Sequence, residues 1–133
     1  MTSGHVDVGH LDGDAYDIHI RGHRLTVDQP VDAGGSDKAP TPTELFAASL
    51  AACVAFYAGR YLDRHGLDRR GLRVHADFEL ATDRPARVTT IQVTVQPPDG
   101  FPAERIPALA AVANHCTVHN TLTNPPEVTV TIT

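Results

Sequence analysis

Residues 41–66 of the chain read TPTELFAASLAACVAFYAGRYLDRHG, and this stretch decides the fold. Thr41 is a candidate N-cap, Pro42 suits the first helical position, and Glu44 completes a Thr-x-x-Glu capping box. Apolar and alanine positions then recur at helical spacing as far as His65, where a glycine follows as a typical stop signal. The stretch therefore predicts one long helix that is buried on almost every face.

Alternating apolar residues predict strands on both sides of this helix. Three short strands are expected between His5 and Val27, separated by turns at residues 12–14 and 22–23. Residues 71–79 and 88–95 should form a hairpin of two longer strands. The chain is thus expected to mix antiparallel sheet with helix.

The remaining segments are set by prolines and glycines. Residues 30–42 hold three prolines and two adjacent glycines, which predicts a surface loop. A second helix is expected over residues 102–115, with Cys116 at its C-terminal end. After two further prolines, Val128, Val130 and Ile132 alternate as in a last strand. No linker divides the chain, so we expect a single domain over residues 1–133.

Composition narrows the class of protein. The 133 residues carry a net charge of −5 without a cluster of lysine or arginine, which argues against nucleic-acid binding. The N-terminus lacks the pattern of a signal peptide, and the apolar run from Leu45 to Gly59 is shorter than a membrane span needs. We expect a cytoplasmic protein without a membrane segment. With 41% hydrophobic residues but no tryptophan, its core is thin enough that oligomerisation would help.

The two cysteines, Cys53 and Cys116, are the only thiols. In a reducing compartment such a pair is more often catalytic or redox-active than structural. Cys53 lies mid-helix, so a cation that favours its thiolate must come from elsewhere, and Arg21 and Arg24 are the nearest N-terminal candidates. At a helix C-terminus the dipole would disfavour a Cys116 thiolate, so Cys53 should attack and Cys116 resolve. Buried cysteine also serves as a small hydrophobe, and Cys53 could be core packing alone.

A metal site is the other chemistry that these residues suggest. His115, Cys116 and His119 lie within five residues, and Cys53 could be a fourth ligand. Adjacent ligands are unusual, however, and the chain has neither a CxxC nor an HExxH motif. We therefore expect no metal and no other cofactor.

Two motifs resemble one known family. Residues 34–53, GGSDKAPTPTELFAASLAAC, and residues 116–122, CTVHNTL, are similar to the two cysteine motifs of the OsmC/Ohr family, the osmotically inducible and organic hydroperoxide resistance proteins. The order of expected elements agrees over nearly the whole chain. The resemblance implies an α+β OsmC-like fold, with antiparallel sheets wrapped around two central helices in an intertwined homodimer.

The resemblance also implies a reaction. Cys53 would attack a hydroperoxide as the peroxidatic cysteine, and Cys116 would resolve the resulting sulfenic acid as a disulfide. A dithiol reductant, a lipoylated protein among the candidates, would then reduce the disulfide. The alternative is a non-catalytic, stress-related binding protein with an apolar pocket at the dimer interface.

Three departures from the family's peroxidase pattern bear on that reaction. The family's glutamate position, ten residues before the first cysteine, holds Thr43, while Glu44 lies one residue later and about 100° around the helix. Its thiolate-polarising arginine has no counterpart at Leu11 or near Ala33, so Arg21 or Arg24 would have to substitute. The proline that commonly follows the second cysteine is also absent. These changes resemble the less characterised branch of the family.

Overall fold

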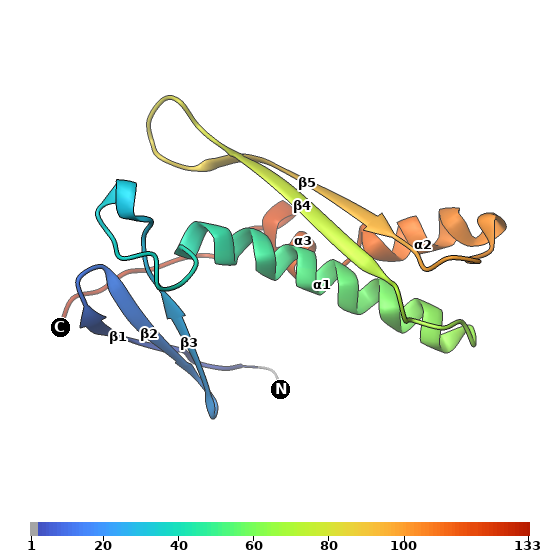
Figure 1. The fold of residues 1–133 in the computed structure, drawn as a ribbon, viewed down its shortest axis with the longest axis horizontal. Coiled ribbons are helices and arrows are strands. Elements are labelled where there is room, and N and C mark those ends of the chain that lie inside the picture. The colour runs from blue at the N-terminus through green and yellow to red at the C-terminus, as the bar shows by residue number, and fades with distance from the viewer. Residues whose placement is uncertain (1–2) are drawn as a thin grey trace. The chain divides into compact units, whose positions relative to one another are not determined.

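The computed structural model describes residues 3–133, which form two antiparallel sheets and three α-helices (Figure 1). The expected α+β content is thereby confirmed. The elements are β1 (Asp7–Asp12), β2 (Ala15–Ile20), β3 (His23–Val27), α1 (Pro42–Arg64), β4 (Arg73–Leu80), β5 (Val88–Gln96), α2 (Ile106–Ala113) and α3 (Thr117–Thr123), with 3-10 turns at Val31–Ala33 and Ala103–Arg105.

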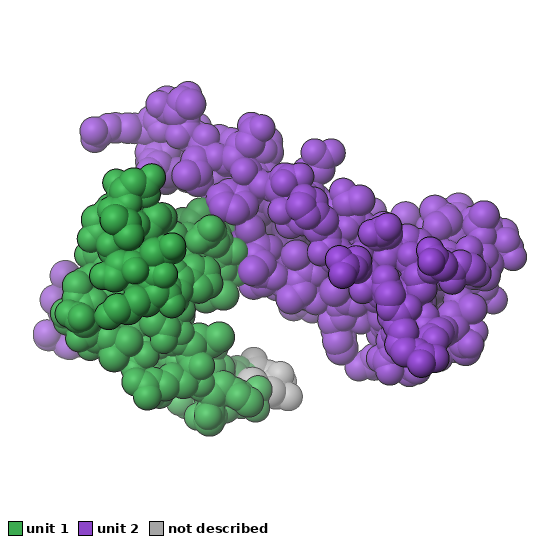
Figure 2. Space-filling model, in the orientation of Figure 1, with its two compact units in different colours: residues 1–46 green, residues 47–133 purple. Residues whose placement is uncertain are grey.

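Contacts along the chain group into two compact units, which meet in sequence between Phe46 and Ala47 near the start of α1 (Figure 2). The first unit holds β1, β2 and β3, and the second holds most of α1 with β4, β5, α2 and α3. The expected single domain over residues 1–133 stays a prediction.

The first unit is a three-stranded antiparallel meander in the order β1-β2-β3, as the alternating sequence predicts. Tyr16 pairs with Val27 and Ile18 with Leu25, so a single register runs along β2 and β3. Arg21 occupies the turn between these strands with a positive φ of 57°. The three N-terminal strands are therefore confirmed.

The loop after β3 is ordered around the carboxylate of Asp28, which is 1% exposed. Its two oxygens accept backbone N–H groups from Gln29 at 2.7 Å and from Lys38 at 3.0 Å. Chiefly because of the Lys38 N–H, and then of the Gln29 N–H, the pKa of Asp28 lies below its usual range. A side chain at Gly35 would collide with the Gln29 carbonyl, so the loop needs glycine there.

The predicted capping box starts α1. The Thr41 N–H donates to Glu44 Oε1 at 2.8 Å, and the Glu44 N–H donates to Thr41 Oγ1 at 3.0 Å. Two of the backbone donors that a helix start leaves unpaired are thereby satisfied. The predicted helix is confirmed, and it ends at Arg64, one residue before the expected position.

Burial of α1 differs from the expectation. Only one side of the helix is covered within the chain, while Phe46 and Phe56 are 41% and 55% exposed. A single chain supplies too few packing partners to cover a helix that is apolar all round. The buried residues are Ala47, Leu50, Val54, Ala58, Gly59, Tyr61 and Leu62.

The apolar part of α1 is also longer than the run from Leu45 to Gly59 on which the sequence-based expectation rested. The helix spans 23 residues and includes an 18-residue window of mean hydropathy 1.5, so by length and composition it could cross a membrane. Core helices of globular proteins meet the same criterion, which makes this weak support for a membrane segment.

The second unit packs the β4–β5 hairpin and α2 along α1 (Figure 1). The hairpin is antiparallel from the Arg73–Gln96 pair to the Leu80–Val88 pair, as predicted. Leu62 of α1 and Leu109 of α2 are almost fully buried in one cluster. This cluster anchors the C-terminal half of α1.

Two expectations for the C-terminal third are wrong. The second helix ends at Ala113, and Cys116 does not close it but precedes a further helix, α3, as its N-cap. No strand forms beyond α3 in the described residues. Val128, Val130 and Ile132 are 78%, 86% and 97% exposed, because the alternating segment finds no sheet edge within this chain.

We expect Asp28→Asn to lower stability at neutral pH and to flatten the acid limb of the stability curve. Because the pKa of Asp28 is lower in the folded than in the unfolded state, its contribution is present above about pH 5 and is lost as pH falls through the folded value. Thermal unfolding at pH 7, 5 and 3 measures this. Asp32→Asn, an exposed carboxyl of the same loop, is the control, and equal stability of Asp28→Asn and wild type at pH 7 would contradict the role.

Candidate active site

Both cysteines belong to one apolar cluster of the second unit. Cys116 is 0% exposed and packs with Leu50 and Val54 of α1, while Cys53 lies at the edge of the cluster and is half-buried. The thiols are free rather than joined in a disulfide. Side chains from β4, β5, α2 and α3 close the cluster: Val74, Ile91, Val93, Val95, Ala113 and Val118.

Cys116 is held at the first turn of α3. Its backbone is extended, with φ −72° and ψ 156°, and its Sγ accepts the His119 N–H at 3.4 Å. Burial raises the pKa of the Cys116 thiol, and the hydrogen bond and charge of neighbouring Cys53 raise it further against the opposing His119 N–H. The expectation that Cys116 is a poor thiolate thus rests on burial. The C-terminal dipole proposed from the sequence is wrong, because a helix starts here.

One side-chain hydrogen bond joins the two cysteine-bearing segments. The hydroxyl groups of Tyr57 and Thr117 lie 2.7 Å apart and form a hydrogen bond in which either can be the donor. Tyr57 follows Cys53 by four residues on α1, and Thr117 directly follows Cys116. Sequence reasoning missed this pair, because the two residues are separated by 60 positions and α3 was not expected.

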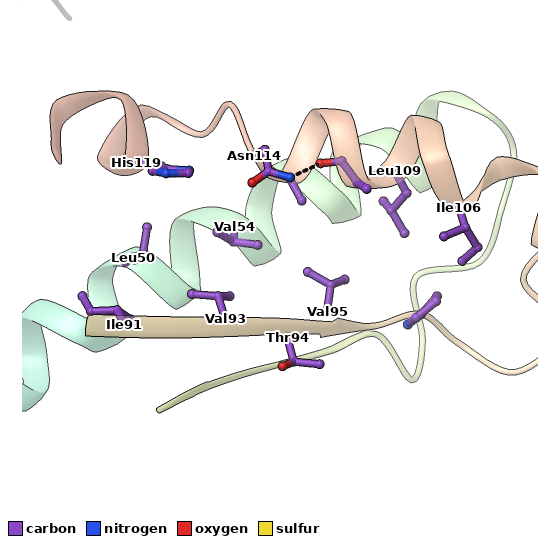
Figure 3. Close-up of a pocket in the computed structure, with 13 residues that line it drawn as sticks. Leu50, Val54, Ile91, Val93, Thr94, Val95, Ile106, Leu109, Asn114 and His119 are labelled. Atoms are coloured by element: carbon purple, nitrogen blue, oxygen red, sulfur yellow. Dashed lines mark hydrogen bonds between the residues drawn. The ribbon is translucent and has the colours of Figure 1, made fainter. Parts of the chain in front are cut away.

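An apolar cavity of about 450 Å³ lies in the same unit (Figure 3). Leu50 and Val54 of α1 face it from one side and β5 from another, while α2 closes a third side. The His119 ring from α3 is among its few polar groups, together with Asn114, whose amide donates to the Ala110 carbonyl. The cavity therefore suits an apolar group. His119 also links the cavity to the buried thiol, because its backbone N–H donates to the Cys116 sulfur.

The two candidate arginines belong to the first unit and differ in their bonding. On β3, the Arg24 guanidinium binds the buried carboxylate of Asp17, with an Nε–Oδ2 distance of 2.9 Å. This hydrogen bond lowers the pKa of Asp17. Arg21, at the β2–β3 turn, has no ion pair with a described residue. Within residues 47–133 no arginine donates a hydrogen bond to Cys53 Sγ, and the expected roles of Arg21 and Arg24 beside this thiol stay predictions.

Glu44 serves the capping box, where its carboxylate accepts the Thr41 N–H. Among residues 3–133, no three histidine, cysteine or acidic side chains gather as metal ligands. His115 turns back to the preceding helix α2, with Nδ1 2.6 Å from the Ala111 carbonyl oxygen. The arrangement offers two neighbouring thiols of unequal exposure, which fits thiol redox chemistry better than metal binding.

Solved structures with the same fold come from several bacteria. A protein from Psychrobacter arcticus, assigned to the osmotic-stress and detoxification response, has a TM-score of 0.80 at 22% identity over 87% of this chain and 85% of its own. An OsmC-like protein from Mycoplasma pneumoniae gives 0.78 at 16% identity, covering 93% and 89%. The organic hydroperoxide resistance protein OsmC from Legionella pneumophila gives 0.69 at 17% identity, covering 92% and 90%.

No curated protein matches the sequence. The family model for OsmC-like proteins does match, from residue 35 to residue 131. That span contains both cysteines, the whole of α1 and all but the last two residues of the second unit. Because the match covers well over half of the sequence, the chain belongs to the OsmC-like protein family.

Proposed function

We propose that this protein is a thiol-dependent hydroperoxide reductase in which Cys53 is peroxidatic and Cys116 is resolving. The observation that carries the proposal is the unequal exposure of two neighbouring thiols, with Cys53 reachable from solvent and Cys116 fully buried beside it. Membership of the family and likeness to a hydroperoxide resistance protein support peroxide-related stress function.

The proposed reaction has three steps. The Cys53 thiolate attacks the distal peroxide oxygen and the O–O bond breaks, which leaves a sulfenic acid on Cys53, while the departing alkoxide takes a proton from solvent to become an alcohol. The Cys116 sulfur then attacks the sulfenic sulfur, which forms the disulfide and releases water. A dithiol, with lipoylated proteins as candidates, reduces the disulfide by exchange and becomes oxidised itself. No cofactor takes part.

Arg21, Arg24 and Glu44 remain candidates for the groups that support Cys53. An arginine beside the thiolate would stabilise it and the departing oxygen. Arg24 would have to leave its pairing with Asp17, whereas Arg21 has no such competing ion pair among the described residues. Glu44 would act in addition to its capping role.

Binding without turnover is the second candidate function, because the 450 Å³ cavity has the size and apolar lining of a small-molecule site. The two functions differ in one observable. A reductase consumes peroxide in proportion to the dithiol supplied, whereas a binding protein leaves the peroxide concentration unchanged.

We also propose that the protein is a cytoplasmic homodimer. Support for the dimer comes from the uncovered face of α1, where Phe56 is 55% exposed, and from the exposed apolar residues Val128, Val130 and Ile132. A second copy would cover both, and stable homodimers bury upwards of about 2,000 Å².

We expect the wild type to consume alkyl hydroperoxide with a dithiol such as dihydrolipoamide. Cys53→Ser should reduce consumption to the uncatalysed background, and Cys116→Ser should consume about one equivalent and stop at the sulfenic acid. A peroxide assay with trapping of the sulfenic acid measures both. If one of Arg21 and Arg24 supplies the cation, replacing that arginine by alanine should slow peroxide consumption, and replacing the other should not. Undiminished consumption by Cys53→Ser would refute the mechanism, and an inactive wild type would favour the binding protein.

Alkylation should separate the thiols. Since burial raises the pKa of Cys116, the thiolate fraction of this residue at pH 7 is small. The rate at which Cys116 is alkylated should therefore keep rising as pH increases well above neutrality. With iodoacetamide at pH 7 we expect Cys53 to react at least about tenfold faster than Cys116. In urea the two cysteines should react alike. Equal rates in the folded protein would contradict the assignment.

Sedimentation should show a dimer at micromolar concentration. Val130→Asp should shift the equilibrium toward monomer, because a charge on the apolar side of the C-terminal segment opposes burial. Thr129→Asp is the matched control, since neighbouring residues of an extended segment face opposite sides. A stable wild-type monomer would end the proposal of a dimer.

A further inference from the structure

A side-chain hydrogen bond between Tyr57 and Thr117 ties α1 to α3. Its oxygens are 2.7 Å apart, which is the distance of a well-formed O–H···O bond. Val118 of α3 also packs against the cluster of Leu50, Val54 and Cys116, and such apolar contacts are non-directional. The hydroxyl pair, by contrast, sets direction as well as distance.

The position of this bond relates it to the cysteines. Tyr57 lies four residues after Cys53, and residues four apart share one face of a helix. Thr117 is the first residue of α3, immediately after the N-cap Cys116. The bond therefore joins the turn that carries one thiol to the residue beside the other.

We propose that Tyr57 and Thr117 are positioning residues that hold the Cys116 segment on α1, so that the buried thiol can close on an oxidised Cys53. The inference rests on the proposed pairing of Cys53 with Cys116. Neither hydroxyl exchanges atoms with the peroxide. Their effect falls on the second step, in which the Cys116 sulfur attacks the sulfenic sulfur and water leaves.

A disulfide imposes a narrow geometry on its two sulfur atoms, so this step is the one most sensitive to placement. The Cys116 sulfur already accepts a hydrogen bond from the His119 N–H, and this bond fixes the sulfur to the first turn of α3. Fixing α3 in turn to α1 leaves little motion between the thiols. Loss of the Tyr57–Thr117 hydrogen bond should therefore slow formation of the Cys53–Cys116 disulfide without changing the rate at which Cys53 attacks the peroxide.

Diamide tests this without requiring any peroxidase activity. One thiolate adds to its N=N bond, and the second attacks the sulfur of this adduct. The S–N bond breaks as the disulfide forms, and the diamide leaves as the hydrazine, which has taken up two protons. We expect Tyr57→Phe and Thr117→Val to slow intramolecular closure about three- to tenfold, the range that the net effect of one hydrogen bond gives. Thr117→Ser, which keeps a hydroxyl, should close at the wild-type rate.

Tyr61→Phe is the matched control, because Tyr61 lies one turn further along α1 and its hydroxyl accepts a hydrogen bond from Arg105 at 3.2 Å, away from both thiols. It should close like wild type, and all variants should keep the wild-type rate of Cys53 alkylation. Wild-type closure in Tyr57→Phe and Thr117→Val, equal slowing in Tyr61→Phe, or no intramolecular disulfide in wild type would each overturn the inference. Normal closure without peroxide consumption would instead overturn the proposed function alone.

Discussion

Burial of Cys116 against α1 is the constraint on which the second unit depends. Its thiol packs with Leu50 and Val54, so the segment after α2 must return to the middle of the long helix. Two opposing effects then act on the sulfur. The first turn of α3 offers it backbone N–H groups, which favour a thiolate, while removal from water favours the thiol. Burial is the larger effect, so the pKa of the Cys116 thiol lies above its ordinary value.

Much of this arrangement could be predicted from the sequence, because it depends on local signals. The Thr41–Glu44 box and the glycine stop define α1 to within a residue, and period-2 alternation defines five strands. The cysteine pair was also predictable, since the chain holds only two thiols, each beside an apolar run. Local patterning of this kind needs no knowledge of what lies across the core.

The parts that escaped prediction depend on distant contacts. Residues 117–123, TVHNTLT, are rich in threonine and poor in strong helix formers, so α3 exists through packing and not propensity. Cys116 is an unusual N-cap residue and gave no start signal. The alternation of Val128, Val130 and Ile132 is typical of a strand in a half-buried sheet, but it does not identify the strand with which this segment would pair. Likewise, nothing local pairs Tyr57 with Thr117.

The value of an arginine at such a site follows from simple arithmetic on an ordinary thiol. Lowering a thiol pKa from about 8.5 to about 6.5 raises the thiolate fraction at pH 7 by roughly 25-fold. The same change weakens the nucleophile by roughly eightfold, for a Brønsted coefficient of about 0.45, so the net gain is only about threefold. The larger benefit of a guanidinium is to stabilise the charge that develops on the departing peroxide oxygen. A chain that keeps both thiols but lacks the cation would therefore still form its disulfide, and would lose mainly the speed of O–O cleavage.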